Sequence, residues 1–195
     1  LAKQNMQVYN MLNVKYFILP GDDGKELAQQ NPDSNGNVWF VNEIRYMQTA
    51  NEEIKALDSL NTKEVAVLRD YNPYGFEDSV KYNEDTTATI KLTEYSLNAL
   101  AYESFSNQDN FAVFSEIYYK EGWNAYIDGE FKPHVSVNYV LRGMEIPAGR
   151  HLIEFKFEPK VIQTGSTISL ISYVLLVLIP LGWFFLITRK KSRGY

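Results

Sequence analysis

"EGWNAYIDGEFKPH", residues 121–134, is the stretch that decides the fold class. Tyr126 and Ile127 lead into Asp128-Gly129, and Glu130 and Phe131 lead out of it. A type I′ turn requires positive φ at both central residues, so an Asp-Gly pair between two such runs strongly indicates a β-hairpin. The fold is therefore expected to contain antiparallel strands around this turn.

The sequence on both sides of this hairpin continues the β pattern. β-branched or apolar residues alternate with polar ones, as in strands buried on one face. Turn-forming residues recur between these runs at the intervals of a β-sandwich. We therefore predict an antiparallel β-sandwich over residues 80–160. Its strands are expected within residues 86–104, 110–119, 135–147 and 150–159, with turns at 107–110, 128–129 and 147–149.

Residues 1–79 have a different character and predict a small α/β segment. A helix is expected over residues 49–61, where Asn51 is a suitable N-cap followed by two glutamates. A short helix is also expected within residues 1–12. Residues 20–37 are expected to be mainly loop, in which residues 25–30 could form a helix. Strands are predicted at residues 14–19, 38–41 and 63–69.

The strongest single signal is an apolar run near the C-terminus. Residues 161–188 contain no Asp, Glu, Lys or Arg. The 21 residues from 168 to 188 suffice to cross a hydrocarbon core of about 30 Å at about 1.5 Å per residue. Pro180 interrupts the run, but membrane-spanning helices tolerate proline. Length and lack of charge favour a transmembrane helix over the alternative, a buried helix of a soluble protein.

The charges on the two sides of this predicted span differ. Residues 189–195, "RKKSRGY", form a basic tail with four cations and no anion. Lys and Arg are enriched on the cytoplasmic side, so the tail is predicted to be cytoplasmic and residues 1–160 extracytoplasmic. Without the tail, the 19 cations of the chain fall to 15 against 24 anions, a net charge of −9. Such an acidic module is a poor partner for nucleic acid or for anionic lipid head groups.

The chain contains no cysteine, which excludes disulfides and thiolate metal sites. It begins without an initiator Met and without the apolar segment of a signal peptide. We therefore expect a fragment of a longer chain with earlier membrane spans. The competing interpretation, a tail-anchored protein with a cytoplasmic head, conflicts with the charge of the tail.

Three stretches in this order carry a family resemblance: "LNVKYFI" (12–18), "SEIYYKEGWNAYIDGEFKP" (115–133) and "NYVLRGMEIPAGRHLIEFKFEP" (138–159). They resemble the C-terminal end of YfhO-like bacterial membrane proteins, which are multi-pass and similar to GT-C glycosyltransferases. The resemblance implies a parent protein that transfers a sugar from a polyprenyl-phosphate carrier to a cell-envelope polymer. The catalytic acidic residue of that family belongs to an early extracytoplasmic loop, so no catalytic residue is carried over to this sequence.

Four residues are candidates for glycan binding. Trp123 could stack on a sugar ring, and Tyr118 and Tyr126 lie close to it in sequence. The alternative, which we favour, is that Trp123 is buried and fills one end of the sandwich. Arg142 could hold a phosphate or carboxylate near the membrane. For Arg142 we favour an ion pair with Glu145 or Glu154.

Other candidate chemistry is weak. The turn accounts for Asp128, and Glu116 has no partner in the sequence for acid–base work. His134 and His151 lack an acidic cluster at ligand spacing, so no metal or cofactor is expected. We predict a non-catalytic domain whose partners are the lipid bilayer, the membrane-embedded remainder of the parent, and an envelope polysaccharide or polyprenyl-linked sugar. The alternative is a membrane-anchored module that binds carbohydrate or a partner and belongs to no transferase.

Overall fold

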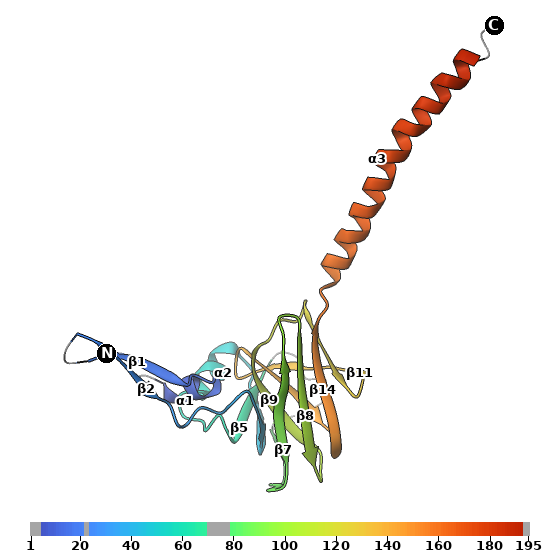
Figure 1. Cartoon of the computed structure of the whole chain (residues 1–195). Helices are drawn as coiled ribbons and strands as arrows, with labels where there is room; N and C mark the ends of the chain where they lie inside the picture. Colours follow the sequence, from blue (N-terminus) through green and yellow to red (C-terminus); the bar gives the residue numbers. More distant parts are fainter. Residues whose placement is uncertain (1–4, 22–23, 70–78, 193–195) are drawn as a thin grey trace. The chain divides into compact units, whose positions relative to one another are not determined.

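The computed structural model describes residues 5–21, 24–69 and 79–192 of the 195-residue chain. The chain divides into two compact units, Leu1–Phe157 and Glu158–Tyr195 (Figure 1). The first unit consists mainly of strands, and the second contains one long helix. The predicted fold class is therefore confirmed: a mainly β protein with a small N-terminal α/β part and a C-terminal helix.

One sheet of the first unit comes entirely from the region where the sequence alternates. Its five antiparallel strands have the order β11-β10-β14-β8-β7, so β14 pairs with both β8 and β10. The strands are β7 (Thr89–Tyr95), β8 (Ala99–Ser106), β10 (Trp123–Ile127), β11 (Glu130–Lys132) and β14 (Gly149–Phe157).

The connection between β10 and β11 is the hairpin predicted from the sequence. Asp128 has φ 51° and Gly129 has φ 84°, the positive values that a type I′ turn requires. Ile127 lies opposite Glu130 at the ends of the two strands.

The second sheet has seven strands in the order β3-β9-β13-β12-β5-β4-β6. Its strands are β3 (Val38–Val41), β4 (Glu43–Tyr46), β5 (Val65–Leu68), β6 (Ser79–Lys81), β9 (Asn110–Ile117), β12 (Val135–Val137) and β13 (Leu141–Ile146). β4 and β5 are parallel, and the short helix α2 (Ala50–Ala56) connects them. Strands from both sides of the predicted boundary at residue 79 share this sheet, so it joins the predicted α/β segment to the predicted sandwich.

The two short helices begin at side-chain caps. The Asn5 side chain accepts the N–H groups of Gln7 and Val8 at the start of α1 (Met6–Met11). α2 begins at a capping box, in which the Thr49 hydroxyl and the Glu52 carboxylate each accept the other residue's backbone N–H at 3.2 Å. The predicted cap, Asn51, was wrong, because this box places the start of the helix two residues earlier.

The predicted helix at residues 25–30 was also wrong. These residues form β2 (Glu26–Gln30), which pairs antiparallel with β1 (Tyr16–Pro20) in a separate two-stranded sheet. Lys, Glu, Leu, Ala and Gln all favour helices, but pairing with β1 satisfies the backbone groups of this segment. Tertiary pairing therefore overrides the local preference.

Two cores lie on opposite faces of β3 and β9 in the seven-stranded sheet, because successive strand residues point to opposite faces. The core on one face includes Met11 of α1 and also Leu57 and Leu60, which follow α2. Ala56 of α2 packs against the same core, so α1 and the end of α2 cover part of that face. The core on the other face lies between the two sheets and makes them a sandwich. This inter-sheet core contains Val38, Leu100, Tyr102, Ala112, Phe114, Ala125, Ile127, Met144, Ile146, Ile153 and Phe155.

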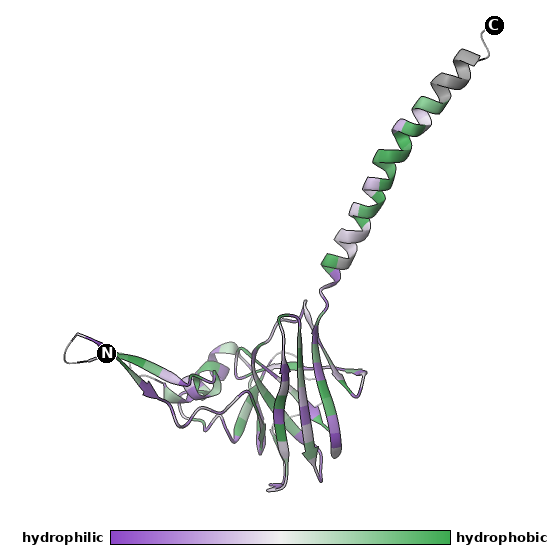
Figure 2. Cartoon of the chain, viewed as in Figure 1, coloured by the Kyte–Doolittle hydropathy of each residue, from purple (hydrophilic) through white to green (hydrophobic). Residues whose placement is uncertain are grey.

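The second unit contains α3 (Lys160–Ser192), which includes Pro180. Its segment Lys160–Phe185 is long and apolar enough to cross a membrane (Figure 2). Large apolar side chains along this segment are exposed. The helix covers the span predicted from the sequence at residues 161–188.

Candidate functional site

Strand ends and turns of both sheets meet at one end of the sandwich, which we call the Phe157 end. We define it by residues 96–98, 117–123 and 138–140 and by Phe157. In the five-stranded sheet, the Phe157 N–H donates to the Asn98 carbonyl at 2.9 Å, and Phe157 lies opposite Trp123. In the seven-stranded sheet, the Tyr118 N–H donates to the Val140 carbonyl at 2.8 Å. Loops that are far apart in sequence therefore form one surface.

Arg142 is buried inside the sandwich at this end. It lies on β13 in phase with Met144 and Ile146 of the inter-sheet core, and only 2% of it is exposed. Its Nε donates to the Ile117 carbonyl at 3.0 Å. Its guanidinium carbon lies 4.3 Å from the centre of the Trp123 ring, a cation–π distance. The arginine thus links the two sheets.

The predicted ion pair of Arg142 was wrong. Glu154 pairs with Lys156 at 3.0 Å, and Glu145 lies out of phase with Arg142 on the same strand, so it points to the other face of the sheet. Within the described part of the chain, no carboxylate lies within 4.0 Å of the Arg142 nitrogens. The burial of this charge is therefore compensated by rings and a carbonyl rather than by a direct ion pair.

The charge of Arg142 interacts with Glu116 at longer range. Burial raises the pKa of the half-buried Glu116, and the positive charge of Arg142 opposes this shift. Burial lowers the pKa of Arg142, and the charge of Glu116 opposes that shift. Among the described residues, the buried Nη1 of Arg142 has no hydrogen-bond partner. The guanidinium therefore keeps hydrogen-bond donors without an acceptor. Burying such donors unpaired costs free energy unless a ligand or a solvent molecule accepts their hydrogen bonds.

His134 and Tyr118 complete this cluster. The His134 ring lies edge-on to Tyr118 at 5.3 Å and to Phe155 at 5.4 Å. Burial lowers the pKa of His134 to about 4, and the charge of Arg142 acts in the same direction. His134 is therefore a neutral ring of the cluster near pH 7. From the sequence, His134 was a candidate only for a metal site, and a place in this cluster was not predicted.

Trp123 is partly exposed and packs against several neighbours. It is half-buried, packs against the inter-sheet core, and its ring lies 5.3 Å from that of Phe157. The expectation of full burial is thus corrected: the ring covers Arg142 and keeps part of its surface accessible. That position is compatible with stacking on a ligand.

Tyr126 does not belong to this cluster. Ala125 and Ile127 of β10 point into the inter-sheet core, so Tyr126 points to the outer face of the sheet. There its ring contacts Phe131 at 6.0 Å and lies 5.2 Å from Lys156 Nζ. The structure therefore brings together three of the four predicted residues, Tyr118, Trp123 and Arg142.

Asp128 has the turn role that the sequence predicted. Its carboxylate lies 2.6 Å from His151 Nδ1 and accepts the Leu152 N–H at 2.9 Å. These bonds hold the β10–β11 turn against β14, and they lower the pKa of Asp128 despite some desolvation. No group of three or more His, Asp and Glu side chains that could hold a metal ion occurs among the described residues.

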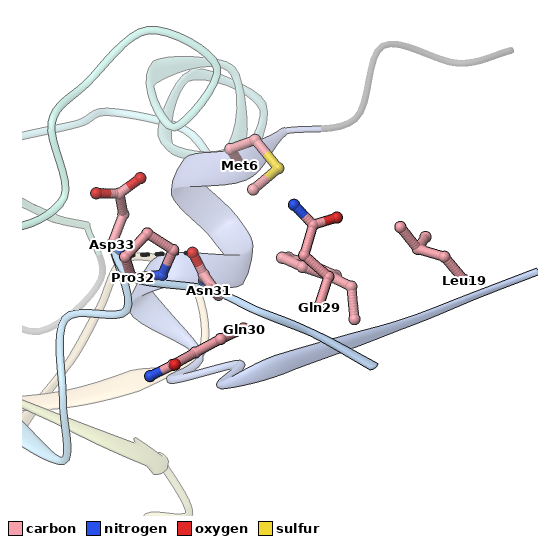
Figure 3. A pocket seen from close by; sticks show the side chains of 8 residues that line it. Met6, Leu19, Gln29, Gln30, Asn31, Pro32 and Asp33 are labelled. Atoms are coloured by element: carbon pink, nitrogen blue, oxygen red, sulfur yellow. Dashed lines mark hydrogen bonds between the residues drawn. The ribbon is translucent and has the colours of Figure 1, made fainter. Parts of the chain in front are cut away.

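Cavities lie elsewhere in the first unit. An open pocket of about 340 Å³ lies between α1 and the β1–β2 hairpin, and Met6, Phe17 and Leu19 are among the residues that line it. Figure 3 shows Met6 of α1 on one side of this pocket and Gln29 of β2 on the other. A cleft of about 470 Å³ includes residues of β3 and β7, such as Trp39 and Ile90. Neither is lined by Tyr118, Trp123 or Arg142.

A comparison with protein families supports the resemblance drawn from the sequence. Residues 75–169 match the family described as bacterial membrane protein YfhO. This stretch covers β6 to β14 and the first residues of α3, so the YfhO-like character of this part of the chain is confirmed. With the apolar helix α3, the match supports a location in a bacterial membrane. Neither the curated proteins nor the solved structures give a match.

Proposed function

We propose that this chain is the extracytoplasmic C-terminal region and last membrane span of a larger protein that resembles polyprenyl-phosphate-sugar-dependent glycosyltransferases. In this proposal the sandwich does not catalyse transfer but holds a cell-envelope glycan or a lipid-linked sugar. The observation that carries the proposal is the buried Arg142, with its unused Nη1 donors, beneath the half-exposed ring of Trp123.

The two side chains suit the two parts of such a ligand. An aromatic face packs on the apolar face of a sugar ring. A guanidinium pairs with a phosphate or carboxylate through parallel hydrogen bonds, which are stronger than bonds between neutral groups. The part of the Trp123 surface that remains accessible and the unused donors of Arg142 thus support one binding site for a charged glycan.

The positions of Glu116 and Asp128 support a non-catalytic role, because the two carboxylates do not lie together at this end. Glycosidic bond chemistry with two acidic residues requires them to flank the bond at a defined separation. Glu116 interacts with the charge of Arg142, whereas Asp128 is engaged in the distant β10–β11 turn. We therefore expect the chain alone to release or transfer no sugar, and Glu116→Gln to leave glycan binding intact.

The proposed topology places the sandwich outside the cytoplasm and the basic tail inside. The four cations after residue 188 support this orientation. A reporter that is active only outside the cytoplasm, fused after Tyr195, should be silent. Activity of that reporter would refute the orientation.

Binding tests the proposal most directly. The 195-residue chain in detergent should bind purified envelope polysaccharide, measured by calorimetry. Arg142→Lys should weaken binding about tenfold, because the point charge of Lys cannot form the paired bonds of a guanidinium. Trp123→Phe should also weaken it, while Tyr126→Ala, on the outer face of the same sheet, should not. Equal loss in all three variants, or no binding by the unmodified chain, would contradict the proposal.

The alternative of a binding module without a transferase uses the same site. The exposed Tyr119, whose ring stacks on Phe157 at 6.4 Å, would enlarge the aromatic surface of such a module. The sequence upstream of this chain separates the two functions. Multiple further spans with an acidic residue in the first external loop would favour the enzyme.

A further inference from the structure

Exposed apolar side chains gather at the Phe157 end. Leu97, in the turn between β7 and β8, is 93% exposed. Tyr95, Ile117 and Tyr119 are each more than half exposed. We call these four residues the apolar rim. A leucine at the tip of a tight turn buries nothing within its own fold, so its surface is available to a partner.

Backbone contacts place the rim directly beside the end of β14. The β7–β8 turn is closed by the Ser96 N–H, which donates to the Ala99 carbonyl at 2.9 Å. Within the same turn, the carbonyl of Asn98, which follows Leu97, accepts the Phe157 N–H, also at 2.9 Å. Leu97 is therefore adjacent in sequence to the residue that holds the end of β14.

The other half of the rim is fixed to the same strand end. The Tyr119 ring stacks on Phe157, and the Tyr119 carbonyl accepts the Trp123 N–H at 3.2 Å. Ile117 is the last residue of β9, and its carbonyl accepts the hydrogen bond from Arg142 Nε. The rim is thus part of the folded end of the sandwich.

The chain itself indicates what covers the rim. Only Glu158 and Pro159 separate the end of β14 from the start of α3, whose apolar segment can cross a membrane. The three residue steps from Phe157 to Lys160 span at most about 11 Å when extended. The strand end that holds Asn98 therefore cannot move far from the point where α3 begins.

We propose that the apolar rim inserts into the interfacial layer of the membrane that α3 spans. Leu97 supplies an apolar tip, and the two tyrosines have the amphipathic rings that collect at the membrane–water interface. This proposal rests on α3 as a membrane span and is independent of glycan binding. A second anchoring point would fix the orientation of the sandwich above the bilayer, which a two-residue connection alone does not do.

Site-specific fluorescence tests the proposal in the full chain. Because the chain contains no cysteine, Leu97→Cys and Leu152→Cys each give a single site for the environment-sensitive dye NBD. Leu152 is the matched control, since it is also exposed but lies five residues before Phe157, about 16 Å along the strand at about 3.3 Å per residue. Both labelled proteins would be reconstituted into vesicles of phosphatidylethanolamine and phosphatidylglycerol.

The dye at position 97 should show a blue-shifted emission. Lipids that carry a nitroxide near the head group should quench the dye at position 97 severalfold more than the dye at position 152. Aqueous iodide should quench position 152 more strongly. Equal quenching by iodide at the two positions would overturn the proposal. A blue shift at 97 without quenching by the nitroxide lipids would also overturn it, because protein rather than lipid would then cover the rim. Circular dichroism checks that each labelled chain is folded.

Discussion

Replacing His134 by Phe should make the sandwich less sensitive to acid. The folded-state pKa of His134 is about 4, because burial and the charge of Arg142 both disfavour the imidazolium. The ordinary value is near 6.5. A histidine with a lowered folded-state pKa binds its proton more readily in the unfolded chain. Its contribution to stability is therefore complete above about pH 6.5 and is lost as the pH falls toward about 4.

The size of the effect follows from the two pKa values. Between pH 7 and pH 5, the unfolded chain takes up about 0.7 proton at this site, whereas the folded protein takes up about 0.1 proton. This difference lowers the free energy of unfolding by about 2 kcal/mol. Phe cannot take up a proton and retains a ring against Tyr118 and Phe155. The variant should therefore lose about 2 kcal/mol less than the unmodified chain over this pH interval.

Urea unfolding of the chain in detergent, followed by tryptophan fluorescence, measures this difference. Both proteins are compared at pH 7 and pH 5, so that other titrating groups such as Glu116 cancel to first order. His151→Gln provides a control of opposite sign, because hydrogen bonds to Asp128 and to the Ala148 carbonyl outweigh desolvation and raise the pKa of His151. Relative to the unmodified chain, His151→Gln should therefore have a free energy of unfolding that is lowered more at pH 5 than at pH 7. Equal acid sensitivity of the unmodified chain and His134→Phe would refute the placement of His134 as a buried neutral ring.

Two further predictions concern the other face of the seven-stranded sheet. Glu53 is buried, pairs with Arg69 at 3.2 Å and accepts the Tyr139 N–H at 2.8 Å, so Glu53→Ala should cost about 3–5 kcal/mol in urea unfolding. A cost below about 1 kcal/mol would show that this buried charge is dispensable. A methyl group added at Gly143 would lie 2.5 Å from the Phe111 ring. Gly143→Ala should therefore cost about 1–3 kcal/mol by overpacking, and an unchanged melting temperature would contradict this contact.

Local patterns predicted the elements but not how they combine. The alternation in residues 86–159 and the Asp128-Gly129 turn correspond to observed strands and an observed hairpin. The short strand β4 was missed, and with it the parallel β4–β5 pair that joins the N-terminal segment to the seven-stranded sheet. Such pairing depends on contacts between residues far apart in the chain, which no local pattern encodes. The prediction for the segment that forms β2 was wrong for another reason: its residues favour a helix individually, but the segment pairs with the neighbouring strand β1.

Part of the candidate site could have been predicted more sharply. Trp123 and Tyr126 are three residues apart on one strand, so strand geometry alone places them on opposite faces of the sheet. Arg142 alternates in phase with Met144 and Ile146, which indicates that it points inward. The neighbours of Arg142, by contrast, come from β9, β10 and β14, and only the folded structure shows that Trp123 and Phe155 cover it.

The apolar rim and Arg142 are parts of one end of the sandwich, and this restricts the ligand that the site could serve. Ile117 belongs to the rim, and its carbonyl holds the Arg142 side chain at 3.0 Å. If the rim lies in the interfacial layer, the guanidinium lies just above it, at the depth of lipid phosphates. A polyprenyl-linked sugar carries its phosphate at this depth and its sugar above it, where Trp123 could stack. Polyprenyl-phosphate sugar in vesicles should therefore compete with envelope polysaccharide for the chain, and Arg142→Lys should weaken that competition more than Tyr126→Ala does.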